Sequence, residues 1–248
     1  MRKPDFLIIG TQKGGTVSAI HHFNQHKDIH LLHQELHFFN QEYDKGIDYY
    51  ESQFKSDKRY VGEKTPMYSY SKRALNKIHR HYPDIKLIMF LREPISRSYS
   101  QWNMCQYRDS NSAFIDYPLY NKPFIDCIKE DVANIANEGY KETDILKRGF
   151  YIDQIEHILS KFPKENLYIA ISEEVKANPE IEYNKIFNFL GVEPTEISFN
   201  PNHHKLEYKS EISKEDALYL YDIYRSYNER LYKLIGEIKD WENYYVTL

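Results

Sequence analysis

The chain has few of the features that mark a disulfide-stabilised, zinc-binding or membrane-spanning protein. Only two of its 248 residues are cysteines, Cys105 and Cys127, and they do not form a Cys-x-x-Cys motif. A disulfide framework or a thiolate zinc site is therefore not indicated. No apolar run approaches the roughly 20 residues that a membrane-spanning helix needs. The apolar run at residues 6–9 is also too short for a secretory signal, so we expect a cytoplasmic protein without a membrane span.

Basic residues are not in excess either. Lys and Arg number 33 against 37 Asp and Glu, which gives a formal net charge of -4. Because nucleic-acid-binding proteins usually carry a net basic surface, we expect no nucleic-acid partner. Apolar and aromatic residues are abundant, since hydrophobic residues make up 41% of the chain and tyrosine occurs 23 times. This composition predicts a globular protein with a sizeable buried core.

Short apolar runs alternate with segments of helical periodicity. The runs that predict strands are residues 6–9, 29–32, 60–62, 86–91 and 167–171. The segments that predict helices are residues 16–25, 71–82, a stretch beginning at Pro94, 151–162 and 213–235. This alternation predicts the α/β class, with one domain over residues 1–248 and a central parallel sheet flanked by helices. Residues 106–145 are polar and lack a strand pattern, so we expect a helical or irregular excursion there.

Polar residues follow the predicted strands at the points where they end. In open parallel sheets, ligands bind beyond the carboxyl ends of the strands, because loops from several strands meet there. The segments in question are Gly10–Thr16, Gln34–His37, Glu63–Pro66, Arg92–Pro94 and Ser172–Glu174. We therefore expect three cations, a carboxylate and a glycine-rich loop to share one edge of the sheet.

The glycine-rich loop after the first strand is the sharpest of these signals. Gly14 and Gly15 allow the backbone to approach a ligand closely, and the helix that follows presents N–H groups that favour an anion. A Walker A loop has its lysine directly after the last glycine, whereas Lys13 precedes both glycines here. The pattern predicts a P-loop-like phosphate site of another kind, and a tight turn with a surface lysine is the structural alternative.

The set of strand-end motifs resembles the sulfotransferases that use 3′-phosphoadenosine-5′-phosphosulfate (PAPS), especially the heparan-sulfate-type branch. The resemblance spans residues 5 to about 191 and weakens towards the C-terminus. Its motifs are the loop from Gly10 to Ser18, Glu35-Leu36-His37-Phe38-Phe39, Glu63-Lys64-Thr65-Pro66-x-Tyr68, and Leu91-Arg92-Glu93-Pro94 with Arg97 and Ser100. Further similar features are Gly149-x-Tyr151, Phe162-Pro163, Glu173 or Glu174, Asn178-Pro179 and Phe189-Leu190-Gly191.

The resemblance implies a role for each of these residues. Glu35 takes the place of the catalytic base, and Lys13 and Lys64 would neutralise the leaving 5′-phosphate. Arg92 and Ser100 would hold the 3′-phosphate. The residues expected to bind PAPS are Lys13, Gly14, Gly15, Thr16, Val17, Ser18, Arg92 and Ser100. No metal is required on this reading, because lysines supply the positive charge.

Sulfuryl transfer requires a base for the acceptor proton, and a base in a partly closed site is expected to have a raised pKa. His37 is a second candidate for this base, since imidazole titrates near neutrality. Its other role would be to orient Glu35 or the acceptor, and we favour that role.

The sequence departs from the family pattern at two places. Gln34 stands where the family usually has a lysine before the catalytic glutamate. No clear Lys-Gly loop near the C-terminus closes over the nucleotide, although residues 202–205 and Lys209 fall in the corresponding region.

Other histidines and aromatic residues suggest weaker sites. His22, His26 and His30 are spaced by four, which would suit zinc on one continuous helix, but residues 28–32 read as an exit into a strand. A polar helix face is the better interpretation. Tyr43, Tyr49, Tyr50 and Phe54 either stack on sugar rings or pack as ordinary aromatics.

The leading hypothesis is a PAPS-dependent sulfotransferase that acts on a hydroxyl or amine of a carbohydrate-like acceptor. Two alternatives stay open: a kinase or NTPase with an atypical phosphate loop, and a non-catalytic nucleotide-binding module. Residues 38–54 and 106–145 lack a strong basic stripe, so we expect a neutral or lightly charged glycan or glycoside acceptor. Neither the acceptor's identity nor the oligomeric state follows from the sequence.

Overall fold

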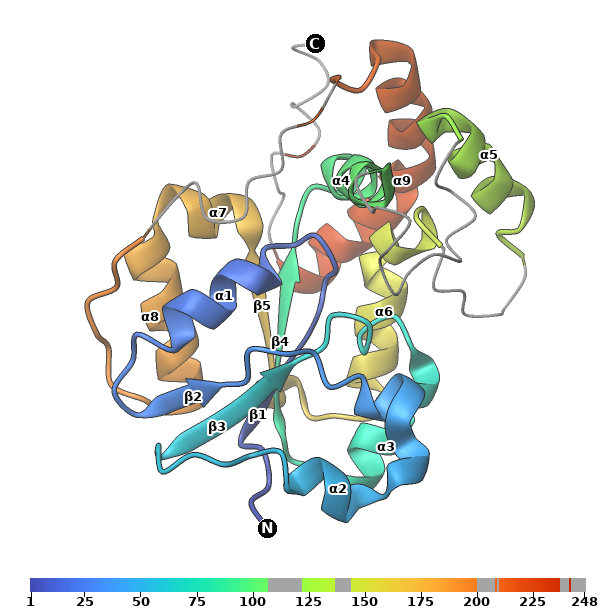
Figure 1. Cartoon of the computed structure of the whole chain (residues 1–248). Helices are drawn as coiled ribbons and strands as arrows, with labels where there is room; N and C mark the ends of the chain where they lie inside the picture. The colour runs from blue at the N-terminus through green and yellow to red at the C-terminus, as the bar shows by residue number, and fades with distance from the viewer. Residues whose placement is uncertain (107–121, 137–143, 200–207, 209, 237–240, 242–248) are drawn as a thin grey trace. The chain divides into compact units, whose positions relative to one another are not determined.

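The computed structural model describes residues 1–106, 122–136, 144–199, 208, 210–236 and 241 (Figure 1). The chain divides into two compact units. The first unit comprises residues 1–92 and 154–205, and the second comprises residues 93–153 and 206–248. The assignment of a single domain to residues 1–248 stays a prediction. Among the described residues, none of the helices combines the length and apolar character that crossing a membrane would require.

The first unit is built on a five-stranded sheet in the order β2-β3-β1-β4-β5, with every adjacent pair parallel. The strands are β1 (Phe6–Gly10), β2 (Ile29–Leu31), β3 (Tyr60–Lys64), β4 (Lys86–Leu91) and β5 (Leu167–Ile171). All five predicted strands are confirmed, and β4 and β5 have the predicted bounds. The α/β class with a central parallel sheet flanked by helices is also confirmed.

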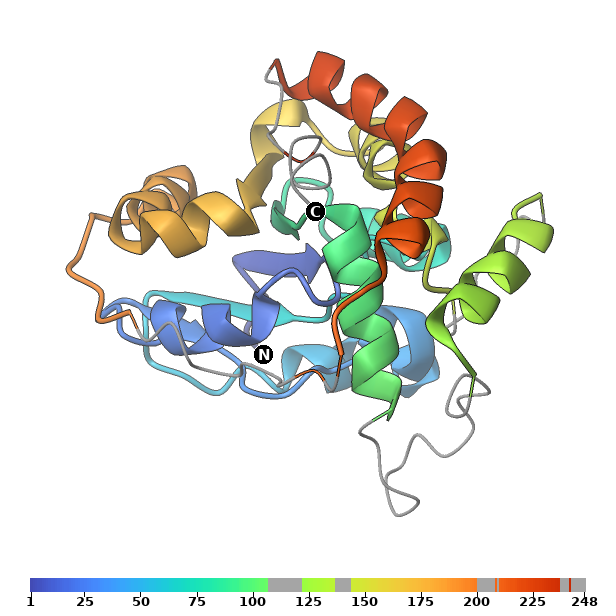
Figure 2. The same ribbon diagram turned by 90° about the horizontal axis from the view of Figure 1, so that it is seen from above.

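Helices cover both faces of this sheet (Figures 1 and 2). The helices are α1 (Thr16–Phe23), α2 (Ile47–Glu51), α3 (Lys72–His81), α7 (Ser172–Ala177), α8 (Pro179–Leu190) and the larger part of α6 (Tyr151–Leu159). Shorter helical turns lie at Phe38–Glu42, Tyr43–Lys45 and Lys164–Asn166. Phe23 of α1 and Phe187 of α8 pack with Phe6 and Ile8 of β1 in one buried cluster. Every position of β1, a central strand, is apolar and buried, as expected for a strand that is covered on both sides.

Helix boundaries follow local capping rules. The Ser71 side chain accepts a hydrogen bond from the Ala74 N–H, so it caps α3 and the predicted helix begins one residue later, at Lys72. The predicted helix at 16–25 ends earlier than expected, at Phe23. Asn24 ends it, because its side chain bonds the carbonyls of Ile20 and Leu31 and accepts from the Leu31 N–H, which couples the helix end to β2.

The second unit is helical in its described residues. It contains α4 (Pro94–Gln106), α5 (Phe124–Ala133), α9 (Lys214–Ile235), the short turn Lys147–Gly149 and the first residues of α6. α4 and α9 lie side by side (Figure 2). The predicted excursion at 106–145 is helical over α5, and its residues 107–121 and 137–143 lie outside the described residues.

Candidate active site

The loop between β1 and α1 is held tightly against the end of β4. The Thr11 N–H donates to the Phe90 carbonyl at 2.9 Å, and the Gly14 N–H donates to the Thr11 carbonyl at 2.9 Å. A Cβ atom on Gly14 would lie 2.5 Å from the Phe90 carbonyl oxygen. Only glycine fits there, because the obstructing atom belongs to the backbone of a central strand. Ser172, at the end of β5, donates a hydrogen bond to the Gly14 carbonyl at 2.5 Å and fixes the loop from the other side.

The loop then turns through two left-handed residues into α1. Lys13 has φ 69° and Gly15 has φ 95°, and a Cβ atom on Gly15 would meet nothing within 4 Å. The backbone at Gly15 therefore has open space beside it, at the N-terminus of a helix whose first N–H groups lack intrahelical acceptors. This arrangement suits an anion. The side chain of Thr16 is buried, whereas Val17 is exposed and Ser18 half-buried on the first turn of α1.

Thr11 adds a feature that fits a polar ligand. Its hydroxyl is buried within the loop and has no hydrogen-bond partner in the structure. Buried hydroxyl groups normally find partners, so an orphan at this position indicates a missing one. A phosphate oxygen is a suitable acceptor for it.

Arg92 stands at the end of β4, beside this loop. Its guanidinium donates to the Lys13 carbonyl at 3.4 Å, so the arginine and the loop are adjacent within the first unit. Ser100 lies on α4 in the second unit, and the predicted pairing of Arg92 with Ser100 on a 3′-phosphate stays a prediction. Arg97, from the same motif, is fully buried and donates to Gln101 and the Ile145 carbonyl, so its guanidinium serves the core of the second unit.

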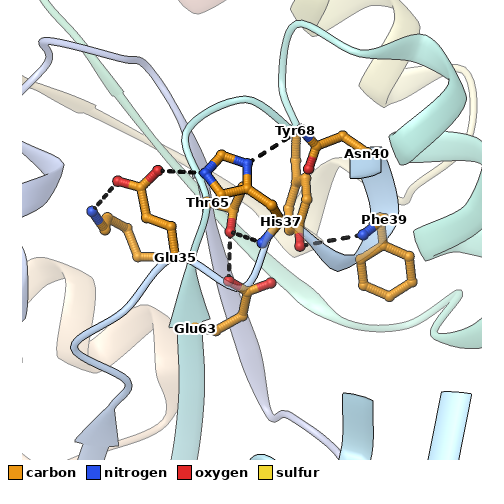
Figure 3. Close-up of polar contacts among 8 residues, drawn as sticks. Glu35, His37, Phe39, Asn40, Glu63, Thr65 and Tyr68 are labelled. Atoms are coloured by element: carbon orange, nitrogen blue, oxygen red, sulfur yellow. Dashed lines mark hydrogen bonds and ion pairs between the residues drawn. The ribbon is translucent and has the colours of Figure 1, made fainter. Parts of the chain in front are cut away.

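Glu35 and His37 follow β2 and meet Lys64 at the end of β3 (Figure 3). The Lys64 ammonium donates to one carboxylate oxygen of Glu35 at 2.5 Å, and His37 Nε2 lies 3.2 Å from the other. The Lys64 side chain is only 3% exposed, whereas that of Glu35 is 32% exposed. The carboxylate therefore reaches solvent while its lysine partner does not. Asn40 Nδ2 lies 3.3 Å from His37 Nδ1 and orients the imidazole from behind.

The electrostatics of this trio correct one expectation. Burial acts to raise the pKa of Glu35, but the His37 hydrogen bond and the Lys64 charge outweigh it, and the net pKa is lowered. The raised pKa expected for a general base is therefore wrong for this arrangement. For His37, burial acts to lower the pKa, but the hydrogen bond and charge of Glu35 outweigh it and the net pKa is raised. Glu35 thus lies between the Lys64 ammonium and the His37 imidazole, and both contacts favour its ionised form.

The three histidines that were considered for a zinc site do not belong to this group of side chains. His22 and His26 fall on either side of the end of α1, and His30 lies on β2, so the three do not share a helix. The His22 ring stacks on Tyr183 with centroids 4.6 Å apart, and His26 Nε2 lies 3.0 Å from the Glu193 carbonyl oxygen. The C-terminal candidates at 202–205 and 209 lie outside the described residues.

The aromatic residues near the candidate base divide into two groups. Tyr50 and Phe54 are buried; Tyr50 packs with Phe38 and Phe39, and Phe54 packs on Tyr50, so both serve the core. Tyr49 remains exposed. Of the four aromatic candidates for sugar stacking, two are therefore unavailable.

Sequence reasoning missed the residues that support the site. The sequence indicates Ser172 only as part of a strand-end segment and Thr11 only as part of the loop. It indicates Glu63 and Thr65 only as part of a motif, although their side chains form the buried hydrogen bonds beneath His37. Their position at the end of a central strand was the available signal.

Comparison with known proteins gives matches over nearly the whole chain. The family model described as "Sulfotransferase domain" matches residues 3–246. Human heparan sulfate glucosamine 3-O-sulfotransferase 3B1 is 27% identical over 264 residues, and this chain spans 65% of its length while 96% of the chain is covered. The membrane-associated sulfotransferase kil1 of Dictyostelium discoideum is 22% identical over 317 residues, with 97% of this chain and 67% of that protein covered. A solved sulfotransferase structure from Alicyclobacillus acidocaldarius has the same fold, with a TM-score of 0.77, 22% identity and coverage of 98% of this chain and 100% of that chain.

Proposed function

The chain belongs to the sulfotransferase family, and we propose that it transfers a sulfuryl group from PAPS to a hydroxyl or amine of a carbohydrate-like acceptor. The resemblance to this family that the motifs indicated is confirmed, and with it the interpretation of the chain as a transferase enzyme. The observation that carries the proposal is the contact of Glu35 with Lys64 and His37 at the sheet edge that also holds the glycine-rich loop.

The donor would bind at the β1–α1 loop. The 5′-phosphate would lie against Lys13, the backbone at Gly14 and Gly15, and the N-terminus of α1 at Thr16. Val17 and Ser18, on the first turn of the helix, complete this set. Fixed N–H groups and ammonium groups would stabilise the negative charge that develops on the leaving phosphate, without reorganising during the reaction. Arg92 and Ser100 would hold the 3′-phosphate, for which the planar guanidinium supplies two parallel donors.

PAPS would supply the sulfuryl group, and the chain supplies the proton acceptor. Glu35 would take the acceptor's proton as the acceptor oxygen or nitrogen forms its bond to sulfur and the bond from sulfur to the 5′-phosphate oxygen breaks. His37 would orient the carboxylate from the other side. Lys64 contacts Glu35, and it lies on β3, which pairs with β1, the strand that leads into the glycine-rich loop. It would therefore stabilise the leaving phosphate from a position next to Glu35.

The acceptor we propose is a glycan or glycoside. The human relative is named for action on heparan sulfate glucosamine, a carbohydrate, which supports this class of acceptor. We propose a neutral or lightly charged member of the class, because residues 38–54 and 106–145 lack a basic stripe. Cytoplasmic localisation and the absence of a metal requirement also remain predictions.

Two measurements test the proposal against its alternatives. Calorimetry should show binding of adenosine 3′,5′-bisphosphate without metal in preference to Mg·ATP; the reverse preference would support a kinase or NTPase. A screen with labelled PAPS and a panel of neutral and sulfated glycans should then show sulfate transfer. Binding of the bisphosphate with no transfer to any acceptor would support a non-catalytic binding module.

A further inference from the structure

Beneath the candidate base lies a carboxylate that the proposed reaction does not use. Glu63 is fully buried in β3, next to Lys64. Because successive side chains of a strand point to opposite faces, Lys64 and Glu63 project to opposite faces of the sheet. The Lys64 ammonium donates a hydrogen bond to Glu35. Glu63 lies under the backbone of His37 (Figure 3).

A hydroxyl group connects this carboxylate to the backbone of the candidate base segment. The His37 N–H donates to the Thr65 hydroxyl oxygen at 3.3 Å, and the Thr65 hydroxyl donates to Glu63 Oε2 at 2.8 Å. Two residues further along, the Phe39 N–H donates to the Tyr68 hydroxyl at 3.4 Å. Tyr68 is itself buried and interacts electrostatically with Glu63. Two backbone N–H groups of one short segment are therefore tied to side chains around a single carboxylate.

The direction of these hydrogen bonds requires an acceptor at Glu63. The Thr65 hydroxyl has one proton, and it gives that proton to Glu63 while it accepts from His37. The Tyr50 hydroxyl donates to the other carboxylate oxygen at 3.3 Å. Both oxygens of Glu63 thus accept hydrogen bonds from hydroxyl groups, and these bonds offset part of the burial that raises the pKa of this carboxyl.

His37 needs such support because its backbone is strained. Its φ of 50° is left-handed, a conformation that is unfavourable for a non-glycine residue and persists only where neighbouring groups impose it. On its carbonyl side, His37 accepts from the N–H groups of Gln41 and Glu42 at 2.8 and 3.1 Å. On its N–H side, His37 is held by the hydrogen bond to the Thr65 hydroxyl oxygen.

We propose that Glu63 is a positioning residue for the candidate base. Its buried carboxylate holds the left-handed turn at His37 in place through the Thr65 hydroxyl, so that Glu35 and His37 converge on the same point. This inference rests on the proposed function, in which Glu35 accepts the acceptor's proton. Glu63 touches no reacting atom and acts through the segment that it holds.

The test compares two variants that each remove one hydroxyl with a third that keeps it. Thr65→Val removes the hydroxyl that bonds His37 while keeping the side-chain shape, and Thr65→Ser restores it. Tyr50→Phe is the matched control, because it removes a different hydrogen bond to the same carboxylate and leaves both ties to the base segment intact. Displacing a reacting group by a fraction of an ångström to 1 Å costs up to about a hundredfold in rate, so we expect kcat of Thr65→Val to fall by about tenfold to a hundredfold. The Kd for adenosine 3′,5′-bisphosphate should stay unchanged, Thr65→Ser should recover kcat, and Tyr50→Phe should keep it even if its Tm falls.

Hydrogen exchange at the His37 amide supplies a readout that needs no turnover. Exchange should accelerate in Thr65→Val and Glu63→Gln and stay slow in Tyr50→Phe. Unchanged exchange in Thr65→Val would overturn the inference, as would a loss of kcat in Tyr50→Phe equal to that in Thr65→Val. If Glu63→Gln does not fold, the Thr65 pair still decides. A wild-type protein that transfers no sulfate to any acceptor would refute the proposed function, and the exchange rates would then show separately whether this carboxylate holds the His37 turn.

Discussion

Breaking the contact between Glu35 and Lys64 should have unequal consequences for stability, depending on which partner is removed. In Glu35→Ala the ammonium of Lys64, only 3% exposed, loses its carboxylate partner. Stranding a buried charge in this way costs about 3 to 5 kcal/mol. In Lys64→Met the carboxylate of Glu35 remains, but it is 32% exposed and can turn to water and to His37. The loss should then be about 1 to 2 kcal/mol, since solvent screens the remaining charge.

Urea unfolding of the two single variants and of Glu35→Ala/Lys64→Met measures this asymmetry. The double variant should be more stable than Glu35→Ala, because the second substitution removes the stranded charge. The pH dependence adds a second check. The folded pKa of Glu35 is lowered, so its pairing contributes stability above the unfolded pKa of about 4.3, and this contribution disappears as the pH falls through the folded value. In Lys64→Met, the stability of the protein should therefore fall less as the pH becomes acidic. A Lys64→Met variant that is as destabilised as Glu35→Ala would refute the reasoning.

Four further outcomes follow from the site. Lys13→Ala and Arg92→Ala should each weaken binding of adenosine 3′,5′-bisphosphate in calorimetry, since a hydrogen bond to a charged group contributes about 1.5 to 3 kcal/mol; unchanged affinity in both folded variants would contradict the donor site. Glu35→Gln should bind the nucleotide normally while the transfer rate falls by about 10² to 10⁴, and an active Glu35→Gln beside an inactive His37→Ala would reverse the assignment of the base. The raised folded pKa of His37 contributes stability below its unfolded pKa of about 6.5 that is lost as the pH rises through the folded value, so denaturation of His37→Gln at pH 6 and pH 8 should show a smaller difference than wild type. Gly14→Ala should lower both Tm and nucleotide affinity, because its Cβ would press on the Phe90 carbonyl; a variant with normal values would show that the loop is less constrained than its contacts indicate.

The sheet could be predicted from the sequence because its strands are buried on both sides. Such strands read as continuous apolar runs, and the bounds of β4, which is buried from Leu87 to Leu91, are predicted for this reason. β5 is half-buried over its first three residues, and its apolar run alone predicts its bounds. The sequence patterns predict no helix at α2, α7 or α8. α7 begins directly at Ser172 without a loop, so its first turn was read as a strand-end segment. Asn178 and Pro179, where α7 ends and α8 begins, were noted only as a motif, although proline at the first position of a helix is a common start signal.

The proximity of Glu35, His37 and Lys64 could be predicted from the sequence, whereas the electrostatics of their contacts could not. The rule that strand ends converge at one edge brings Glu35, His37 and Lys64 together, and the structure shows these contacts. The sign of the pKa shift at Glu35 depends on distances of 2.5 and 3.2 Å, which no spacing in the sequence encodes. The support from Glu63 through Thr65 was also out of reach, since it depends on a left-handed turn at a histidine.

The lowered pKa of Glu35 is compatible with a role as base once the donor is considered together with Lys64. In the structure, the hydrogen bond of His37 and the charge of the Lys64 ammonium together make Glu35 a weaker proton acceptor. A 5′-phosphate at the glycine-rich loop would draw the same ammonium towards its own oxygens, because two anions would then share one buried cation. As the ammonium moves towards the phosphate, the positive charge near Glu35 decreases while the carboxylate stays buried. The affinity of Glu35 for a proton therefore rises. The carboxylate would thus become a stronger base only when a donor is bound, which would couple removal of the acceptor's proton to the presence of the group that the acceptor attacks.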